Sequence, residues 1–216
     1  MNLIGIADFL HLASIVLLLA KIKIKRRCDA VSLKSLILYL TCYILRYVNP
    51  WIFKGSFVSI LFKLAIISLY AYLIYLVRFK FYKTYEEQRD TLYISIIYAL
   101  SILCALIFGP KLRFEKVFIW TFFHAVSLWI EAFGILPQII LLRRSSKTNI
   151  IQVDYIFLLS LYRMIYFMYW LYSYITSTRV QTNLIVSSLI QTIIFSDFIV
   201  VYIYFKMSNK EFELPY

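Results

Sequence analysis

Long apolar stretches alternate with short charged breaks along the whole chain. A helix needs about 20 apolar residues to cross the hydrocarbon core of a bilayer, and cutting the sequence at its charged breaks leaves seven stretches of that order. They are Asn2 to Ala20, Ser32 to Val48, Phe57 to Val77, Leu92 to Phe108, Val117 to Leu142, Val153 to Tyr174 and Asn183 to Phe205. The pattern predicts an all-α membrane protein with seven transmembrane helices.

The composition favours the same class. Of the 216 residues, 62% are hydrophobic and only 16% are charged, which is more apolar surface than a soluble core of this length can hide. The first stretch ends at basic residues beginning with Lys21 instead of a small-residue cleavage site, so we expect a retained helix and no signal peptide. We expect one membrane domain over residues 1–205 and a short cytosolic tail over residues 206–216.

The basic residues predict an orientation. If the N-terminus is luminal, the opposite side of the membrane holds Lys21, Lys23, Lys25, Arg26, Arg27, Arg78, Lys80, Lys83, Arg89, Arg143, Arg144, Lys147, Lys206 and Lys210. The luminal side keeps only Lys54, Lys111, Arg113, Lys116 and Arg179. This bias predicts a luminal N-terminus and a cytosolic C-terminus. Topology and contact with anionic lipid heads then explain the net charge of +12, and we expect no nucleic-acid partner.

Two Arg-Tyr pairs suggest an internal repeat. Arg46 and Tyr47 are adjacent in the second stretch, and Tyr162 and Arg163 are adjacent in the sixth. With the fourth stretch as a link, three helices would lie on either side of it, which is typical of a 3+1+3 parallel repeat. Two matching dipeptides also arise by chance in a chain this rich in tyrosine.

Several ionisable side chains lie within the apolar stretches, and we single out seven of them. Each costs at least about 2.5 to 3.5 kcal/mol at the centre of a bilayer, so such groups normally face the protein interior or a watery cavity. They are Asp8, His11, Arg46, Lys63, Glu131, Arg163 and Asp197. We predict that Asp8, Lys63 and Asp197 are structural charges within the bundle. The sequence leaves His124 open between a cavity wall and the lipid interface.

One helix face combines polar and aromatic groups. Arg163, Tyr166 and Trp170 recur at spacings of three and four residues and so share a face. Glu131 is the expected partner of Arg163. Arg46 has no acidic neighbour in its own helix, so we expect an external carboxylate to bind its guanidinium fork. A structural ion pair with aromatic packing is the alternative interpretation of this face.

His11 lies one turn after Asp8. A histidine in a polar cavity changes charge between neutral and mildly acidic pH, which predicts pH-gated binding. A neutral, hydrogen-bonding histidine is an equally good interpretation.

Taken together, these residues resemble the KDEL receptors. The resemblance extends over nearly the whole chain and rests on "MNL" at the start, Asp8 with His11, "RY" at Arg46, "ILPQ" after Glu131, "YR" and "YW" around Arg163, and "QTI" before Asp197. It implies a seven-helix fold similar to SWEET and PQ-loop proteins. It also implies a Golgi receptor that binds KDEL- or HDEL-like C-terminal signals of escaped ER luminal proteins at acidic pH and returns them to the ER in retrograde vesicles.

The resemblance further implies residue roles and a location in the ER and Golgi membranes. Arg46 would receive the terminal carboxylate of the peptide, His11 would sense pH, and Glu131 would form a hydrogen-bonded lock with Tyr162 and Arg163. The implied peptide-binding set is Arg46, Tyr47, Asn49, Glu131, Tyr162, Arg163, Tyr166 and Trp170. Lys206 and Lys210 would provide the signal that the COPI coat reads on the cytosolic side.

The chain also departs from the family. Ile4 and Gly5 stand where one arginine is usual, and Ser173 stands where another is usual. Asn49 replaces an acidic residue, so the preferred tetrapeptide stays open. The tail lacks a second lysine directly after Lys210. No nucleophile with a base, no metal cluster and no phosphate loop is visible in the sequence, and we expect neither enzymatic activity nor a cofactor. A proton-coupled small-solute transporter of the SWEET/PQ-loop type is the alternative, because one fold hosts many functions.

Overall fold

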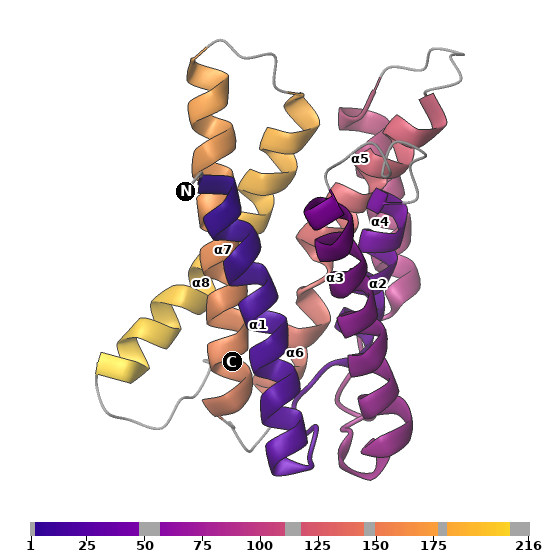
Figure 1. Cartoon of the computed structure of the whole chain (residues 1–216), viewed down its shortest axis with the longest axis vertical. Helices are drawn as coiled ribbons and strands as arrows, with labels where there is room; N and C mark the ends of the chain where they lie inside the picture. Colours follow the sequence, from indigo (N-terminus) through magenta and orange to yellow (C-terminus); the bar gives the residue numbers. More distant parts are fainter. Residues whose placement is uncertain (1–2, 48–56, 111–117, 145–149, 177–180, 208–216) are drawn as a thin grey trace.

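The computed structural model describes residues 3–47, 57–110, 118–144, 150–176 and 181–207, and these fold almost entirely into helices (Figure 1). The α-helices are α1 (Leu3–Lys25), α2 (Leu33–Tyr47), α3 (Phe57–Tyr75), α4 (Ile94–Phe108), α5 (Phe118–Phe133), α6 (Leu136–Arg144), α7 (Ile150–Ile175) and α8 (Thr182–Met207). A π-helix, η2 (Leu76–Lys80), and a 3-10 turn, η3 (Tyr82–Thr84), continue α3. The described ranges contain no strand, so the all-α prediction is confirmed.

The helices follow the predicted stretches in order, with one difference. The fifth stretch is interrupted at residues 134–135, where α5 ends and α6 begins. A Cβ atom on Gly134 would lie 2.8 Å from the carbonyl oxygen of Ile130, so only glycine fits this turn without a shift of the backbone. Pro137 is in the first turn of α6, where its missing N–H leaves no hydrogen bond unmade.

Four helical segments of the described chain are long and apolar enough to cross a membrane, as judged from their length and composition. They are Leu3–Lys25, Phe57–Lys80, Phe118–Arg144 and Thr182–Val200, and Ile94–Phe108 is a shorter apolar helix. These segments support an integral membrane protein. The count of seven crossings and the 3+1+3 repeat stay predictions.

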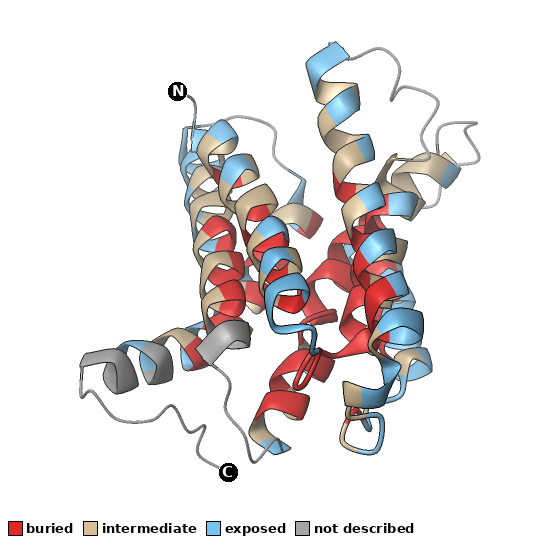
Figure 2. Ribbon diagram, turned by 60° about the horizontal axis from the view of Figure 1, so that its bottom comes forward, coloured by how far each residue is buried: buried red, intermediate tan, exposed pale blue. Residues whose placement is uncertain are grey.

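The helices pack in two groups that meet in the middle of the bundle (Figure 1). Helix α1 lies along α7, which also packs against α8, while α2 packs against α3 and α5, and α4 packs against α5. Tyr39, Trp129 and Tyr162 are fully buried. Exposed residues lie along the outer helices (Figure 2). Large apolar side chains such as Phe57 and Ile193 are among the exposed residues, as expected for a surface that faces lipid.

A buried polar network ties the loops together at one end of the bundle. The carboxylate of Asp90 accepts hydrogen bonds from the Ser32 hydroxyl at 2.9 Å and the Tyr85 hydroxyl at 2.8 Å. The side chain of Gln138 accepts from the backbone N–H of Ser32 at 2.8 Å and donates to the carbonyl of Ala30 at 2.7 Å. Burial and the hydrogen bond to Asp90 raise the pKa of Tyr85, which keeps its hydroxyl protonated as a donor. This network fixes the start of α2 against the start of α6.

Candidate functional site

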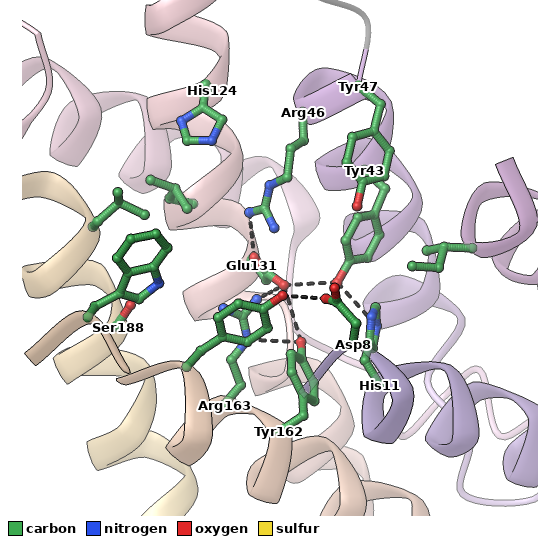
Figure 3. Close-up of a pocket in the computed structure, with 15 residues that line it drawn as sticks. Asp8, His11, Tyr43, Arg46, Tyr47, His124, Glu131, Tyr162, Arg163 and Ser188 are labelled. Carbon is green, nitrogen blue, oxygen red and sulfur yellow. Dashed lines mark hydrogen bonds and ion pairs between the residues drawn. The ribbon is translucent and has the colours of Figure 1, made fainter. Parts of the chain in front are cut away.

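A cavity of about 170 Å³ lies between the two groups of helices (Figure 3). Its lining comes from six helices and consists of Asp8, His11, Tyr43, Arg46, Tyr47, Ile66, His124, Leu128, Glu131, Tyr162, Arg163, Tyr166, Trp170, Leu184 and Ser188. Five of the seven predicted intramembrane ionisable residues are in this set, and Lys63 and Asp197 are not. Charges that are far apart in the sequence therefore converge on one polar space.

Glu131 on α5 is the centre of the site. Its carboxylate is 1% exposed and forms ion pairs with the guanidinium groups of Arg46 on α2 and Arg163 on α7. The hydroxyls of Tyr43 and Tyr162 donate to the same carboxylate at 2.9 and 3.2 Å. A buried charge needs paired and hydrogen-bonded neighbours, and here four side chains from two other helices supply them (Figure 3).

Arg46 has an internal anion, so the expectation that it lacks one is wrong. Its Nη2 atom pairs with Glu131, and its Nε–H donates to the Ser127 hydroxyl at 3.3 Å. The error has a plain cause, because both partners come from α5 and the spacing of residues along α2 carries no information about α5. The Arg46 side chain is still 18% exposed, compared with 9% for Arg163. Arg46 is therefore the more accessible of the two guanidinium groups.

Arg163 pairs with Glu131, as the sequence predicted. Its Nε–H donates to the Tyr162 hydroxyl at 2.8 Å, and its guanidinium carbon lies 4.9 Å from the centre of the Tyr162 ring and 5.9 Å from that of Tyr166. The hydroxyl of Tyr162 thus accepts from Arg163 and donates to Glu131. These contacts hold the guanidinium group against the carboxylate at the wall of the cavity.

His11 on α1 is connected to Glu131 through a tyrosine. Its Nε2 atom lies 3.2 Å from the Tyr43 hydroxyl and 3.3 Å from the Tyr70 hydroxyl, and its ring stacks on Tyr162 with centroids 4.6 Å apart. Because Tyr43 donates its proton to Glu131, its oxygen is left to accept from an Nε2–H of His11. His11 is therefore linked to the central carboxylate by two hydrogen bonds that share the Tyr43 hydroxyl.

The rest of the predicted peptide-binding set is partly in this site. Tyr47, Tyr166 and Trp170 line the cavity. The Tyr166 hydroxyl donates to the carboxylate of Asp8, which places a predicted structural charge on the cavity wall. Asn49 lies outside the described residues.

Lys63 and Asp197 are not among the residues that line the cavity. The Nζ atom of Lys63 is 5.6 Å from the centre of the Tyr47 ring, and the carboxylate of Asp197 pairs with Arg143 at 2.7 Å on an exposed surface. Lys206 is in the last turn of α8, where the structure does not describe the side chains. Lys210 lies outside the described residues.

Sequence reasoning left the position of one group in the site open and missed another group. His124 lies on the cavity wall (Figure 3), which answers the question of its position. Tyr43 bridges His11 to Glu131, but the sequence contains 19 tyrosines and nothing in residue type alone distinguishes this one. Tyr43 lies three residues before Arg46 and four before Tyr47, so all three share one face of α2. This spacing could have identified Tyr43 from the sequence.

Comparison with known proteins identifies the family. Residues 27–173 match the family described as ER lumen protein retaining receptor. An ER lumen protein-retaining receptor of Kluyveromyces lactis is 35% identical over 224 residues, covering 100% of this chain and 99% of that protein. The chain belongs to the ER lumen protein-retaining receptor family. Receptors of the same name from Dictyostelium discoideum (34% identical, 100% of both chains) and Caenorhabditis briggsae (33% identical, 99% of both chains) are further relatives.

The part of the chain that matches the receptor family contains most of the site. Residues 27–173 include Arg46, Glu131 and Arg163, whereas Asp8 and His11 lie before this range. The full-length similarity to the receptors of other organisms extends over α1 as well. The ion-paired centre is therefore part of the region by which the receptor family is recognised.

Proposed function

We propose that this chain is a retrieval receptor that binds KDEL- or HDEL-like C-terminal signals of escaped ER luminal proteins in the acidic Golgi. The receptor would then return these proteins to the ER in retrograde vesicles. Membership of the family and the names of the relatives support the receptor role. The observation that carries peptide binding is the pair of arginines on either side of Glu131 at the wall of a polar cavity.

A terminal carboxylate suits Arg46 for a physical reason. The planar guanidinium fork donates two parallel hydrogen bonds to a carboxylate, which fixes the direction as well as the strength of the contact. Glu131 occupies one edge of this fork, and the side chain keeps an exposed part. We infer that the ligand carboxylate binds Arg46 while Arg163 retains Glu131.

The formal charge of the cavity accounts for a preference for acidic pH. With both histidines neutral, Arg46 and Arg163 balance the carboxylates of Asp8 and Glu131. Each proton taken up by His11 or His124 leaves one positive charge without a partner. Histidine commonly titrates between about pH 5 and 8, so an anionic peptide gains attraction as the pH falls and loses it as the pH returns to neutral.

The size of the cavity limits what can enter it. A volume of about 170 Å³ is smaller than the roughly 300 to 1,000 Å³ of pockets that hold drug-sized ligands. We infer that the terminal residue of the signal enters first and that the two groups of helices separate around Arg46 to admit the rest.

The cellular arrangement belongs to the same proposal. We place seven crossings in a 3+1+3 repeat in the ER and Golgi membranes, with the N-terminus in the lumen and the C-terminal tail in the cytosol. The basic loops support this orientation. Lys206 and Lys210 would then be on the side where the COPI coat assembles.

Peptide binding to the purified receptor tests this function. A labelled Lys-Asp-Glu-Leu peptide should bind at about pH 5.5 and much more weakly at about pH 7.4, and an amide in place of its terminal carboxylate should abolish binding. Arg46→Ala should also abolish binding, while Arg143→Ala, which removes a cation away from the cavity, should not. Binding that is indifferent to both amidation and pH would contradict the proposal. Flux of labelled solute through proteoliposomes without peptide binding would favour the transporter alternative.

A further inference from the structure

A ladder of exposed aromatic rings runs along the outer face of α3 and into η2. The ring centroids of Tyr72 and Tyr75 are 6.2 Å apart, and those of Tyr75 and Phe79 are 5.8 Å apart. All three side chains are exposed, and Phe79 is 66% exposed. From α1, the Nζ atom of Lys23 lies 4.9 Å from the centre of the Tyr72 ring. Two helices thus share one surface of aromatic rings and positive charge.

The π-helix places the last ring of the ladder. The backbone N–H of Phe81 donates to the carbonyl of Leu76 at 2.8 Å, which closes a wider turn than that of an α-helix. Leu76 and Val77 stay buried in this turn, while Arg78, Phe79 and Lys80 are exposed. The ladder therefore ends between two cations.

The α1–α2 loop is fastened to the same place. The backbone N–H of Cys28 donates to the Thr84 hydroxyl at 3.0 Å, and its thiol donates to the carbonyl of Phe81 at 3.2 Å. Burial raises the pKa of the Cys28 thiol, so it stays protonated as a donor. The basic end of α1 and the basic residues around η2 and η3 consequently lie at one end of the bundle, which the charge bias predicts to face the cytosol.

The cations of this surface lack carboxylate partners. Within the described residues, no ion pair is formed by Lys23, Lys25, Arg26, Arg78, Lys80 or Lys83, and all six side chains are exposed. Basic residues near them do pair, as Lys21 does with Asp154 and Arg27 with Asp29. The sequence itself contains no acidic residue between Asp29 and Glu86. The surface therefore keeps positive charge without an ion-pair partner, which an external anion can neutralise.

We propose that this surface, formed by Lys23, Tyr72, Tyr75, Arg78, Phe79 and Lys80, binds a phospholipid with an anionic headgroup. Arg78 and Lys80 contact the headgroup phosphate, and Lys23 neutralises further charge. The ladder lies along the glycerol and the upper part of the acyl chains, where aromatic rings commonly sit at the membrane interface. Clustered cations at the end of a membrane helix attract anionic lipids, and a zwitterionic headgroup leaves them uncompensated. This lipid site is separate from the peptide cavity and does not depend on the proposed receptor function.

Lipid binding to the purified full chain in neutral detergent tests the proposal. Native mass spectrometry and the thermal unfolding midpoint are measured with phosphatidylinositol phosphate, with phosphatidylcholine and with soluble inositol phosphate. We expect binding of the anionic lipid and a higher midpoint, with neither effect from phosphatidylcholine. Each of Arg78→Gln, Lys80→Gln and Lys23→Gln should weaken binding about five-fold. Tyr75→Ala should weaken binding of the lipid, but the variant should still bind the anionic lipid in preference to phosphatidylcholine.

A matched control is available on another helix. Arg144 is exposed at the end of α6 and donates to the Thr91 hydroxyl, so Arg144→Gln removes the same charge away from the ladder and should leave binding unchanged. All substituted side chains are exposed, and the unfolding midpoint without lipid checks that each variant folds. Equal losses from Arg144→Gln and Arg78→Gln would overturn the proposal, because binding would then follow net charge alone. Soluble inositol phosphate binding as tightly as the lipid would also overturn it, because the aromatic ladder would then contribute nothing.

Discussion

Replacing Glu131 by glutamine removes the only carboxylate between Arg46 and Arg163 in the described site while keeping the shape of the side chain. Glutamine can still accept from Tyr43 through its carbonyl oxygen, but its amide group donates and so cannot satisfy a guanidinium group. Removing one partner of a buried ion pair leaves an uncompensated charge, which costs about 3 to 5 kcal/mol. Since Glu131 is 1% exposed, solvent screening does not reduce this figure much.

The expected loss of stability is large enough to measure as a fall in the melting temperature. In a protein of about 150 to 250 residues, 1 kcal/mol shifts the unfolding midpoint by about 2 to 4 °C, so Glu131→Gln should lower it by about 6 to 20 °C. The assay is thermal unfolding of the purified receptor in detergent, followed by tryptophan fluorescence. A peptide with a free terminal carboxylate should recover more of the midpoint in the variant than in the unchanged protein, because it supplies the missing anion.

Asp197→Asn is the matched control for this experiment. It breaks an ion pair between Asp197 and Arg143, but the Asp197 side chain is 66% exposed. Exposed pairs contribute about 0 to 1 kcal/mol, so the midpoint should fall by no more than about 4 °C. If the two variants lost the same amount, the central position assigned to Glu131 would be wrong.

Three further predictions concern the same site and the helix break. Tyr43→Phe removes one of the hydrogen bonds to the buried carboxylate of Glu131, which should cost about 1.5 to 3 kcal/mol in unfolding experiments and should flatten the pH dependence of peptide binding; an unchanged pH profile would contradict the bridge to His11. Each proton taken up with the ligand changes the binding affinity by about tenfold per pH unit. Binding becomes tighter at lower pH because the proton adds positive charge to the cavity. His11→Asn and His124→Asn should therefore each reduce the slope of log affinity against pH by about one. A slope that neither variant alters would exclude both histidines as the groups that take up the proton. Gly134→Ala forces a Cβ against the carbonyl oxygen of Ile130 and should destabilise the receptor by about 1 to 3 kcal/mol, and a melting temperature equal to that of the unchanged protein would show that the turn relaxes freely.

Much of the fold follows from local properties of the chain. A backbone in lipid must satisfy its own hydrogen bonds, so apolar stretches of this length form helices whatever their neighbours are. The described helices accordingly follow the predicted stretches. The pairing of Glu131 with Arg163 was also predicted, because a costly charge within an apolar stretch requires a partner and few candidates existed.

The neighbours of each helix face depend on long-range packing. Spacing along α2 places Tyr43, Arg46 and Tyr47 on one face, but it carries no information that α5 lies opposite. Glu131 is 85 residues from Arg46, and the contact between them exists only because α2 packs against α5. The interruption at Gly134 is a second example, because α5 ends at a turn that only glycine fits without a backbone shift, although the apolar pattern continues. A periodic pattern thus predicts helices and the faces they present, while the charges that meet depend on which faces are packed together.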